Sequence, residues 1–463
     1  MSLLTRLYWS CYLACHMRGQ AQYPFRAPAS IAEDRDRSVR RMVAYASRHV
    51  PYYRRTLAEL GLHPGDFRTV SDLARLRLLG PDWIRSHPEQ FVSETMSLQR
   101  CLGLETSGSS GLRRTIYADP GSLFRNAAHA ERERGMVTAA IGKRHGYREA
   151  VIVYSPSIAV SSTPRVQQFL RQHALFPSRM QIQRLYIDSL ESPAAYLPRL
   201  NEFAPDVIQG YGSGIESLFD HLHATGASFH RPRVVCYHSD GISARMRQLI
   251  LTHFKIPVFS AYQACEALKI GFECSEHQGY HINIDLYPVR IIGKDGDTLP
   301  EGEVGEVVVS NLVNRAMVLL NYRLGDLAVM LTEPCRCGRT LPRLLLQEGT
   351  AHDFIRLPSG RIVDPSHSYI IFTAEPALRE YQMVQITPSH FRLNLVVPDP
   401  GEREACGRRI AAAFHRHFPG DATAEVVFVD RIELSGGGKK KAVVLLPREQ
   451  QSERLQDGKN HEH

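Results

Sequence analysis

The sequence predicts an α/β protein with a large, multi-layer N-terminal domain and a small α+β domain near its C-terminal end. Three observations lead to this prediction. The chain has 463 residues, more than the roughly 100–200 residues of one ordinary domain. From about residue 149, short apolar runs such as "EAVIVYS" and "PRVVCYHS" alternate with helical segments, which is typical of a layered, mostly parallel sheet. Beyond residue 280, turn signals such as "GKDGD" and "PEGEVG" separate alternating strands.

The first hundred residues are predicted to be mainly helical. The stretch "RRMVAYASRHVPYYRRTLAELGL" has a helical pattern that breaks at Pro51 and resumes after it. Near the start of the chain, apolar residues fall at helical spacing: Leu3, Leu4, Leu7, Tyr8, Cys11, Tyr12 and Cys15. Because polar residues interrupt this run, we expect an amphipathic helix docked on the body through that face rather than an export signal.

These changes of pattern suggest three parts. We place the N-terminal body at residues 1–347, with its mainly helical part at 1–100 and a β-rich subdomain at 280–345. The segment 348–450, which contains "HFRLNLVVPD" and "AEVVFVDRIEL", predicts a mobile C-terminal lid domain. The polar tail 451–463 lacks apolar periodicity and is expected to be disordered.

Composition narrows the classes of function. The formal charge of +8 is dominated by arginine, which suits an anionic small molecule, and no basic motif interleaved with aromatics indicates nucleic acid. No stretch approaches the ~18 apolar residues that span a bilayer, so we expect no membrane partner. Nine cysteines, an odd number in a long chain, do not suit a disulfide framework. We therefore expect a reduced, cytoplasmic protein.

The stretch "TSGSSGLRR" is a candidate phosphate-binding loop. Gly108 and Gly111 permit close backbone approach, so successive N–H groups could wrap a polyphosphate. Hydroxyl donors flank them: Thr106, Ser107, Ser109 and Ser110. The stretch lacks the Gly-Lys-Ser/Thr ending of P-loop enzymes, and read alone it also fits an exposed turn.

Three further patterns follow along the chain. "YQACE" places Tyr262 and Glu266 just after a short strand, and "LNYRLGD" places Arg323 and Asp326 in a turn between apolar runs. "SGGGKKK" sets Lys439 behind three glycines, on a loop that should be exposed. Each has an ordinary alternative: a tyrosine at the edge of the core, an ion-paired aspartate, or a solvated lysine run.

Taken together and in this order, these stretches resemble the adenylate-forming superfamily, and specifically its phenylacetate–CoA ligase-like branch. The resemblance covers nearly the whole chain. It also rests on "LAELGLHPGDFRTVSDLARL" near the start, on "FAPDVIQGYGSGIESL" in the middle, and on "CRCGRTLPRL", which matches the Cys-x-Cys-Gly-Arg segment peculiar to the branch.

The resemblance implies a two-step reaction, in which a carboxylate attacks the α-phosphate of MgATP and a nucleophile then takes the acyl group. By the family motifs, Thr106 to Gly111 would hold the β- and γ-phosphates, Glu266 would help bind Mg²⁺, and Asp326 would accept the ribose hydroxyls. Lys439 matches the catalytic lysine, whose positive charge stabilises the charge that builds on the phosphoryl oxygens. The resemblance implies a hinge at Asp353 and further nucleotide-binding residues, namely Ser239, Asp240, Tyr262, Arg323 and Arg339.

Five positions differ from the family pattern. Arg113 stands where the phosphate loop usually has Pro, Gln263 where the Tyr-Gly motif has Gly, and Leu324 where a Thr is usual. In the hinge "GTAHD", Thr350 replaces an Arg and His352 replaces the first Asp. We expect the loop to bind its phosphates with more positive charge and less rigidity than its relatives do.

"FECSEHQGYH" and "EPCRCGR" form a candidate metal site. Cys274, His281, Cys335 and Cys337 together make a usual tetrahedral zinc set, and His277 is the alternative to His281. Four protein ligands leave no open position for substrate, so the zinc would be structural. The alternative is that the thiols are free and pack as small hydrophobes.

The leading hypothesis is an aryl acid:CoA ligase (AMP-forming), an acid–thiol ligase that uses ATP, Mg²⁺ and CoA and carries a structural Zn²⁺. The alternative keeps adenylation but passes the acyl group, or AMP itself, to an amine or hydroxyl acceptor. A third hypothesis is a non-catalytic nucleotide-binding protein. The oligomeric state is left open, with a homodimer as one option.

Overall fold

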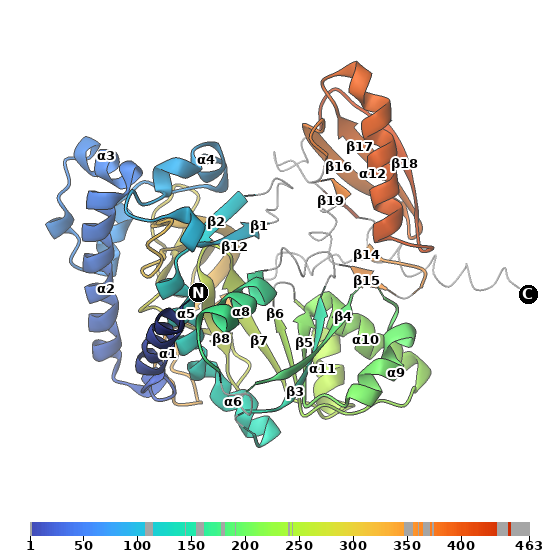
Figure 1. Cartoon of the computed structure of the whole chain (residues 1–463), viewed down its shortest axis with the longest axis horizontal. Helices are drawn as coiled ribbons and strands as arrows, with labels where there is room; N and C mark the ends of the chain where they lie inside the picture. Colours follow the sequence, from blue (N-terminus) through green and yellow to red (C-terminus); the bar gives the residue numbers. More distant parts are fainter. Residues whose placement is uncertain are drawn as a thin grey trace, which may run out of the picture.

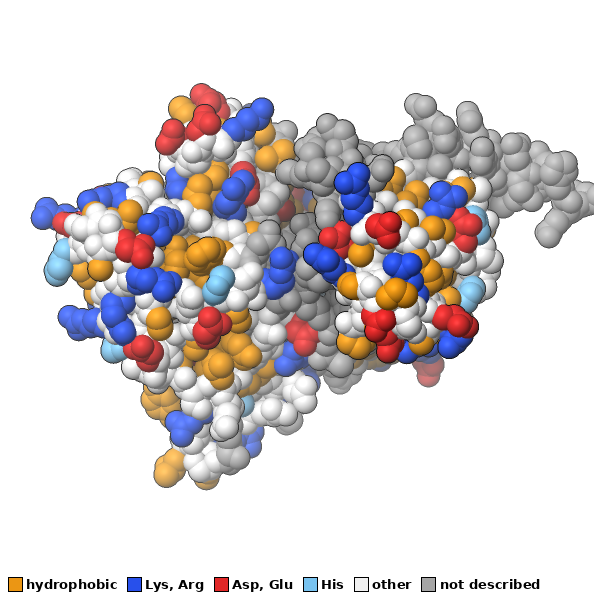
Figure 2. Space-filling view, turned by 90° about the horizontal axis from the view of Figure 1, so that it is seen from above, with side chains coloured by type: hydrophobic (Ala, Val, Ile, Leu, Met, Phe, Trp, Pro, Cys, Tyr) orange, Lys and Arg blue, Asp and Glu red, His pale blue; other side chains and the backbone are white. Residues whose placement is uncertain are grey.

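The computed structural model describes residues 2–106, 114–143, 145–153, 162–176, 181–189, 191–238, 241–242, 244–346, 355–359, 361–363, 371–372, 375–432 and 443–445. Figure 1 shows a large body and a smaller C-terminal unit. In the described part of the chain, no helix is long and apolar enough to cross a membrane. On the face drawn in Figure 2, basic, acidic and apolar side chains are interspersed.

The N-terminal part is helical, and its longer helices are α1 (Leu3–Met17), α2 (Pro28–His49), α3 (Pro51–Glu59) and α4 (Pro81–Ser86). Proline stands at the first turn of α2, α3 and α4, where its missing N–H has no intrahelical partner to lose. The break predicted at Pro51 is confirmed, since α2 ends at His49 and α3 begins at Pro51.

The helix predicted at the start of the chain is present, but the predicted docking face is wrong. Trp9 stacks on Phe124 of α5 (Pro120–His129), with ring centroids 4.9 Å apart, and Tyr12 and Leu13 pack into the same cluster. Most of the residues expected to dock are instead exposed: Leu3, Leu4, Leu7, Tyr8, Cys11 and Cys15. The large indole buries more apolar area than the leucines could, so Trp9 sets which face turns inward.

One 11-stranded sheet organises the body. Its first half is parallel, in the order β4-β3-β5-β6-β7, and its second half is antiparallel, in the order β8-β9-β13-β12-β11-β10. The parallel strands are β3 (Arg148–Val153), β4 (Gln183–Asp188), β5 (Val207–Tyr211), β6 (Val234–His238) and β7 (Val258–Ala264). The antiparallel strands are β8 (Leu268–Glu273), β9 (Tyr280–Ile282), β10 (Val289–Ile292), β11 (Val304–Val309), β12 (Tyr322–Leu331) and β13 (Arg343–Leu346). The strands of 280–345 therefore continue the parallel sheet instead of forming a sheet of their own.

Helices cover both faces of the parallel half, as the predicted layered α/β class requires. One face packs on α9 (Pro193–Phe203), α10 (Gly212–Thr225) and α11 (Ala244–Thr252). The other face packs on α6 (Glu131–Ile141), while α5 and α8 (Ser162–His173) form a further cluster with α1. Along β6, Val234 and Cys236 face α6 while Val235 and Tyr237 face the opposite helices. The predicted fold class is confirmed.

A two-stranded hairpin, β1 (Leu102–Thr106) and β2 (Arg114–Ala118), stands apart from the large sheet and brackets residues 107–113. Asn314 ties the hairpin to the body, because its Nδ2 donates to the carbonyl oxygen of Tyr117 at 2.8 Å and its Oδ1 accepts from the Asp119 N–H at 3.2 Å. The two ends of the candidate phosphate loop are thus fixed by a strand pair.

The C-terminal unit has its own four-stranded sheet, in the order β18-β17-β16-β19, packed on α12 (Arg403–His417). Its strands are β16 (Glu380–Thr387), β17 (His390–Val396), β18 (Thr423–Phe428) and β19 (Val443–Val444). A small hairpin of β14 (Ile355–Arg356) and β15 (Ile362–Val363) is held by Arg361, whose Nη1 donates to Asp421 Oδ2 at 3.0 Å. The domain boundaries expected at 347/348 and 450/451 lie outside the described residues and stay predictions.

Candidate active site

Two tyrosine–carboxylate contacts link β7 to β12. The Tyr262 hydroxyl, near the end of β7, donates to Asp326 Oδ2 of β12 at 2.6 Å. The Tyr322 hydroxyl, at the start of β12, donates to Glu266 Oε1 just beyond β7 at 3.0 Å. Thus β7 supplies the tyrosine that orients the Asp326 carboxylate of β12, and β12 supplies the tyrosine that orients the Glu266 carboxylate in the turn after β7.

These contacts require a strongly bent sheet. Three strands, β8, β9 and β13, lie between β7 and β12 in the hydrogen-bonded order. In a flat sheet the four spacings would separate β7 and β12 by roughly 19 Å, well beyond the reach of one tyrosine. The 2.6 Å contact between Tyr262 and Asp326 is therefore made across a sheet that curls back on itself.

A bulge in β12 turns Asp326 toward β7. Glu306 of β11 pairs with Leu327, whereas Val308 pairs with Arg323. Between these two pairs β12 advances by four residues while β11 advances by two, which is a bulge in β12. Gly325 lies inside this bulge with φ +88°, a left-handed backbone conformation that L side chains rarely adopt. The glycine of "LNYRLGD" is therefore needed for the backbone path that presents Asp326.

Glu266 lies in the tight connection between β7 and β8 and is 7% exposed. Its backbone carbonyl accepts from Asn311 Nδ2 at 2.9 Å. The neighbouring Cys265 thiol donates to the carbonyl oxygen of Glu105 on β1 at 3.5 Å. Three of the sequence motifs are thereby brought together: the strand that leads into "TSGSSG", the "YQACE" turn and the "LNYRLGD" bulge.

The ionisation of the neighbouring groups follows from burial. Burial, with the Asp326 and Glu266 carboxylates nearby, raises the pKa of Tyr262 well above its usual value, so the hydroxyl stays a donor. At the carboxyl end of β6, His238 lies beside Tyr211 of β5, with ring centroids 5.9 Å apart. Burial lowers the pKa of His238 to about 4, so the imidazole is neutral near pH 7.

Two of the predicted nucleotide-binding arginines are engaged in other contacts. Arg323 pairs with Glu306 on the neighbouring strand, with Nε to Oε1 at 3.0 Å. Arg339 lies with its guanidinium carbon 5.0 Å from the ring centre of Phe25 and 5.9 Å from that of Phe272, beside the cysteine cluster. The remaining predicted site residues fall outside the described residues: Ser107, Gly108, Ser109, Ser110, Gly111, Ser239, Asp240, Asp353, Lys439 and the side chain of Thr106.

The four residues of the candidate metal site lie together. The possible ligand atoms of Cys274, His281, Cys335 and Cys337 all lie within 4.8 Å of one another. Cys274 Sγ is 3.6 Å from Cys335 Sγ, and Cys337 Sγ is 3.3 Å from His281 Nε2. Zinc bonds of ~2.3 Å to sulfur and ~2.0 Å to nitrogen give tetrahedral ligand separations of about 3.5–3.8 Å, so the donor set fits this ion.

The hydrogen bonds of the two ring nitrogens favour His281 over His277 as the histidine of this cluster. His281 Nδ1 lies 3.2 Å from the carbonyl oxygen of Leu341, which leaves Nε2 directed at the thiols. Burial lowers the pKa of His281 to about 4, which keeps the ring neutral. The alternative, His277, has its Nδ1 3.2 Å from Arg247 Nη1 and 3.5 Å from Glu273 Oε2 instead.

Sequence reasoning missed a polar network behind Tyr262. Arg247 pairs with Glu273 at 3.0 Å, and Glu273 accepts the backbone N–H of Ser260 at 3.0 Å. The Ser260 hydroxyl lies 2.7 Å from the Tyr280 hydroxyl, and the ring of Tyr280 is 5.9 Å from that of Tyr262. No short motif carries this network, because its members come from α11, β7, β8 and β9.

The fold is that of the adenylate-forming ligases. The structure resembles 2-hydroxyisobutyryl-CoA ligase in complex with 2-HIB-AMP and CoA in the thioesterification state, with a TM-score of 0.62, 15% identity and 94% of each chain covered. It also resembles that ligase in the postadenylation state, with a TM-score of 0.55, 16% identity and 91% of each chain covered.

Within that class, the chain is similar to phenylacetate-coenzyme A ligases, as the sequence motifs indicate. It is 24% identical to the enzyme of Thermus thermophilus over 399 residues, which cover 79% of this chain and 81% of the relative. It is 23% identical to the enzyme of Escherichia coli, with 65% of this chain and 67% of the relative covered. Protein CapK of Staphylococcus aureus is 20% identical, with 81% of each chain covered. No family model matches the chain.

Proposed function

We propose that the protein is an AMP-forming acid–thiol ligase that activates an aromatic carboxylic acid with ATP and transfers the acyl group to CoA. The main support is that three candidate binding elements lie close together. Asp326 and Glu266 each accept a hydrogen bond from a tyrosine, and Cys265, next to Glu266, contacts the strand that leads into the candidate phosphate loop. The similarity to phenylacetate-coenzyme A ligases supports the same reaction.

In the first half-reaction, a carboxylate oxygen of the acid attacks the α-phosphorus of ATP and pyrophosphate leaves. No general base is needed, because the acid is already ionised near pH 7. We assign the ribose hydroxyls to Asp326, whose acceptor oxygens suit two neutral donors and whose orientation is fixed by Tyr262. We assign the β- and γ-phosphates to residues 106–111 and the charge developing at the α-phosphate to Lys439.

A magnesium ion would neutralise phosphate charge in this step, and Glu266 is the residue that we assign to it. A carboxylate is the ligand type that Mg²⁺ prefers, and the Tyr322 hydroxyl holds that carboxylate in one orientation. Glu266 also lies next to Cys265, which contacts the strand leading into the phosphate loop. The Glu266 carboxylate in the β7–β8 turn therefore fits such an ion.

In the second half-reaction, the CoA sulfur attacks the acyl carbon, AMP leaves, and the thiol proton passes to solvent. The acyl pocket is proposed at the carboxyl ends of β5 and β6, where Tyr211 and His238 stand side by side. A neutral imidazole beside an aromatic ring suits an uncharged aryl body. We propose the domain division at 347/348, a hinge at Asp353 and, for the cysteine cluster, a structural zinc ion that clamps the loop after β8 to the β12–β13 connection.

The proposal is tested by a panel of aryl and aryl-acetic acids with MgATP, with and without CoA. We expect acid-dependent pyrophosphate release, and an acyl-CoA thioester by mass spectrometry when CoA is present. If no acid gives pyrophosphate release, the result would support the hypothesis of a non-catalytic nucleotide-binding protein instead. Acyl-AMP that persists with CoA but is consumed by an amine or alcohol would establish the alternative acceptor.

A further inference from the structure

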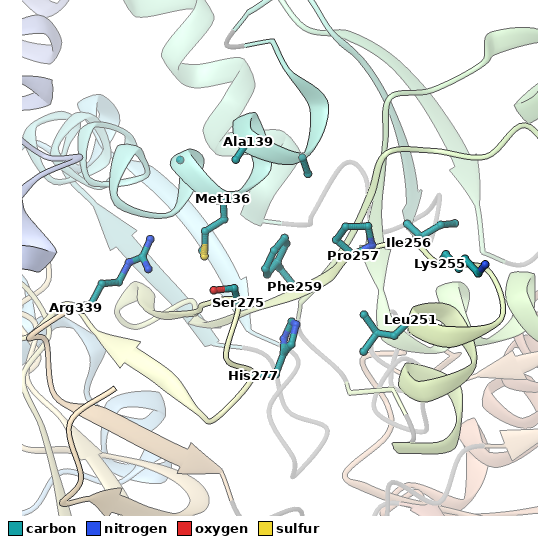
Figure 3. A pocket seen from close by; sticks show the side chains of 12 residues that line it. Met136, Ala139, Leu251, Lys255, Ile256, Pro257, Phe259, Ser275, His277 and Arg339 are labelled. Atoms are coloured by element: carbon teal, nitrogen blue, oxygen red, sulfur yellow. The ribbon is translucent and has the colours of Figure 1, made fainter. Parts of the chain in front are cut away.

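A cavity of about 660 Å³ lies at the amino end of β7, between α6, the α11–β7 connection and the loop after β8 (Figure 3). This volume is in the range of small-molecule sites. Met136 and Ala139 come from α6, Pro257 from the α11–β7 connection, Phe259 from the start of β7, and His277 from the loop after β8. The other lining residues are Gly135, Ala140, Leu251, Lys255, Ile256, Ser275 and Arg339.

The cavity is separate from the candidate active site. Phe259 lines the cavity near the start of β7, whereas Tyr262 contacts Asp326 near the end of the same strand. Successive side chains of a strand point to opposite faces, and Phe259 packs in the cluster on the α6 face. The cavity and the carboxylate pair therefore use opposite ends and opposite faces of β7.

The lining has the chemistry of a site for an amphipathic anion. Its middle is apolar, with Met136, Phe259 and Pro257 facing one another in Figure 3. Lys255 and Arg339 lie at its two ends. The lining, as far as the structure describes it, contains no acidic side chain, so its fixed charge is positive. An apolar body with an acidic head group would satisfy both features.

Arg339 is placed to receive the head group. Its guanidinium lies over Phe25 and near Phe272, and these rings fix its plane. In the described part of the chain, the Arg339 Nε atom is buried without a hydrogen-bond partner. Because this Nε is closed off from the cavity, an anionic oxygen there would pair with the remaining N–H donors of the guanidinium, which offers five in all.

Two residues of the lining, from different elements, are held in a rare backbone conformation. Lys255 and His277 both have φ 53°, in the left-handed region that residues other than glycine seldom occupy. The His277 N–H donates to the Cys274 carbonyl oxygen at 3.1 Å, and Arg247 holds the ring through its Nδ1. Strained residues of this kind gather at binding sites, where the surrounding structure over-determines them.

We propose that this cavity binds a small amphipathic anion, an apolar chain or ring with one acidic head group, at a site distinct from the one that holds ATP and the acid. The apolar body lies along α6 and Phe259, and the head group pairs with Arg339 or Lys255. The inference does not depend on the proposed reaction, since it concerns a binding site alone.

The test is calorimetric titration of the full-length protein with octane-1-sulfonate, an apolar chain whose sulfonate is not a carboxylate substrate, in the presence of saturating MgATP. We expect one equivalent to bind, and octan-1-ol to bind about tenfold more weakly because it lacks the charge. Ala139→Phe, at an exposed rim position of α6, should weaken binding by placing a ring in part of the apolar space.

Three charge variants complete the test. Lys255→Gln should weaken octane-1-sulfonate binding several-fold if the head group lies at that end, and Arg339→Gln should do so if it lies at the other. Lys294→Gln, which changes an exposed lysine outside the cavity, is the matched control and should bind like the wild type. The proposal is overturned if no binding is seen, if Ala139→Phe binds as tightly as the wild type, or if all three charge variants bind equally.

Discussion

Replacing Asp285 with asparagine should destabilise the N-terminal body by about 3–5 kcal/mol, because it leaves a buried arginine without its counter-charge. Arg132 donates to both carboxylate oxygens of Asp285, at 2.7 and 2.8 Å, and its Nε donates to Gln20 at 2.8 Å. Its guanidinium also lies 4.0 Å from the ring centre of Tyr23. Arg132 is 2% exposed and Asp285 is 7% exposed, so water cannot replace the lost partner.

The matched control is Asp34→Asn, the same chemical change at a solvated ion pair. Asp34 pairs with Arg26 at 2.9 Å, but the two side chains are 28% and 44% exposed. Such a pair contributes about 1 kcal/mol or less, because water and salt screen it. The free energies of unfolding of the two variants should therefore differ by at least about 2 kcal/mol.

Tryptophan fluorescence during urea unfolding is the assay. Both tryptophans of the chain, Trp9 and Trp83, lie in the N-terminal body, so the signal reports on the body and not on the C-terminal unit. If Asp285→Asn lowers the free energy of unfolding by less than about 1 kcal/mol, as the control does, then burial does not make this ion pair important for stability.

The pH dependence of this difference has a definite sign. Burial alone would raise the pKa of Asp285, but the charge and hydrogen bonds of Arg132 outweigh it and hold that pKa well below its usual range. A depressed carboxyl pKa stabilises the fold above the unfolded value of about 3.9 and loses that effect as pH falls below it. The gap between wild type and Asp285→Asn should stay constant from neutral pH to about 5 and shrink below about 4.

Three further predictions concern the candidate site. Cys335→Ser should reduce the zinc content measured by elemental analysis from about one equivalent to none. Cys406→Ser, which changes a buried cysteine of α12, should leave the zinc content unchanged. Metal-free wild-type protein would contradict the zinc assignment. Asp326→Asn should raise the KM for ATP in pyrophosphate release by about 10–100-fold, and Tyr262→Phe by less, because only the orienting hydroxyl is lost; an unchanged KM for both would exclude the ribose role. Lys439→Ala should slow acyl-AMP formation by at least about 100-fold in single-turnover assays while sparing ATP binding, and undiminished formation would refute the assignment.

Sequence patterns predicted the local structure better than its contacts. The helical spacing of Leu3, Leu7 and Cys11 correctly predicts a helix, but periodicity does not say which face meets the body. Trp9 decides that through its stack on Phe124, a residue more than a hundred positions away. The residue types, three cysteines with His281, likewise suggest a zinc ligand set. Their meeting depends on the pairing of β9 with β13, which no sequence pattern indicates.

The long-range contacts of the site were beyond sequence reasoning. The motifs that contain Tyr262 and Asp326 can be recognised in the sequence, but the contact between the two side chains depends on the bend of the sheet between β7 and β12. The same holds for Arg132 and Asp285, whose partnership leaves no local pattern. Their pairing arises from tertiary packing, which joins segments that no periodicity relates.

The central claim is the order of two chemical steps at one site, and a pulse–chase measurement tests it most directly. The protein is incubated with MgATP and an accepted aryl acid, the ATP is removed, and CoA is added while acyl-AMP and acyl-CoA are followed by mass spectrometry. We predict that acyl-AMP accumulates without CoA and is then converted to an equal amount of acyl-CoA and AMP. Thioester formation without prior acyl-AMP, or acyl-AMP that CoA leaves untouched, would contradict the claim.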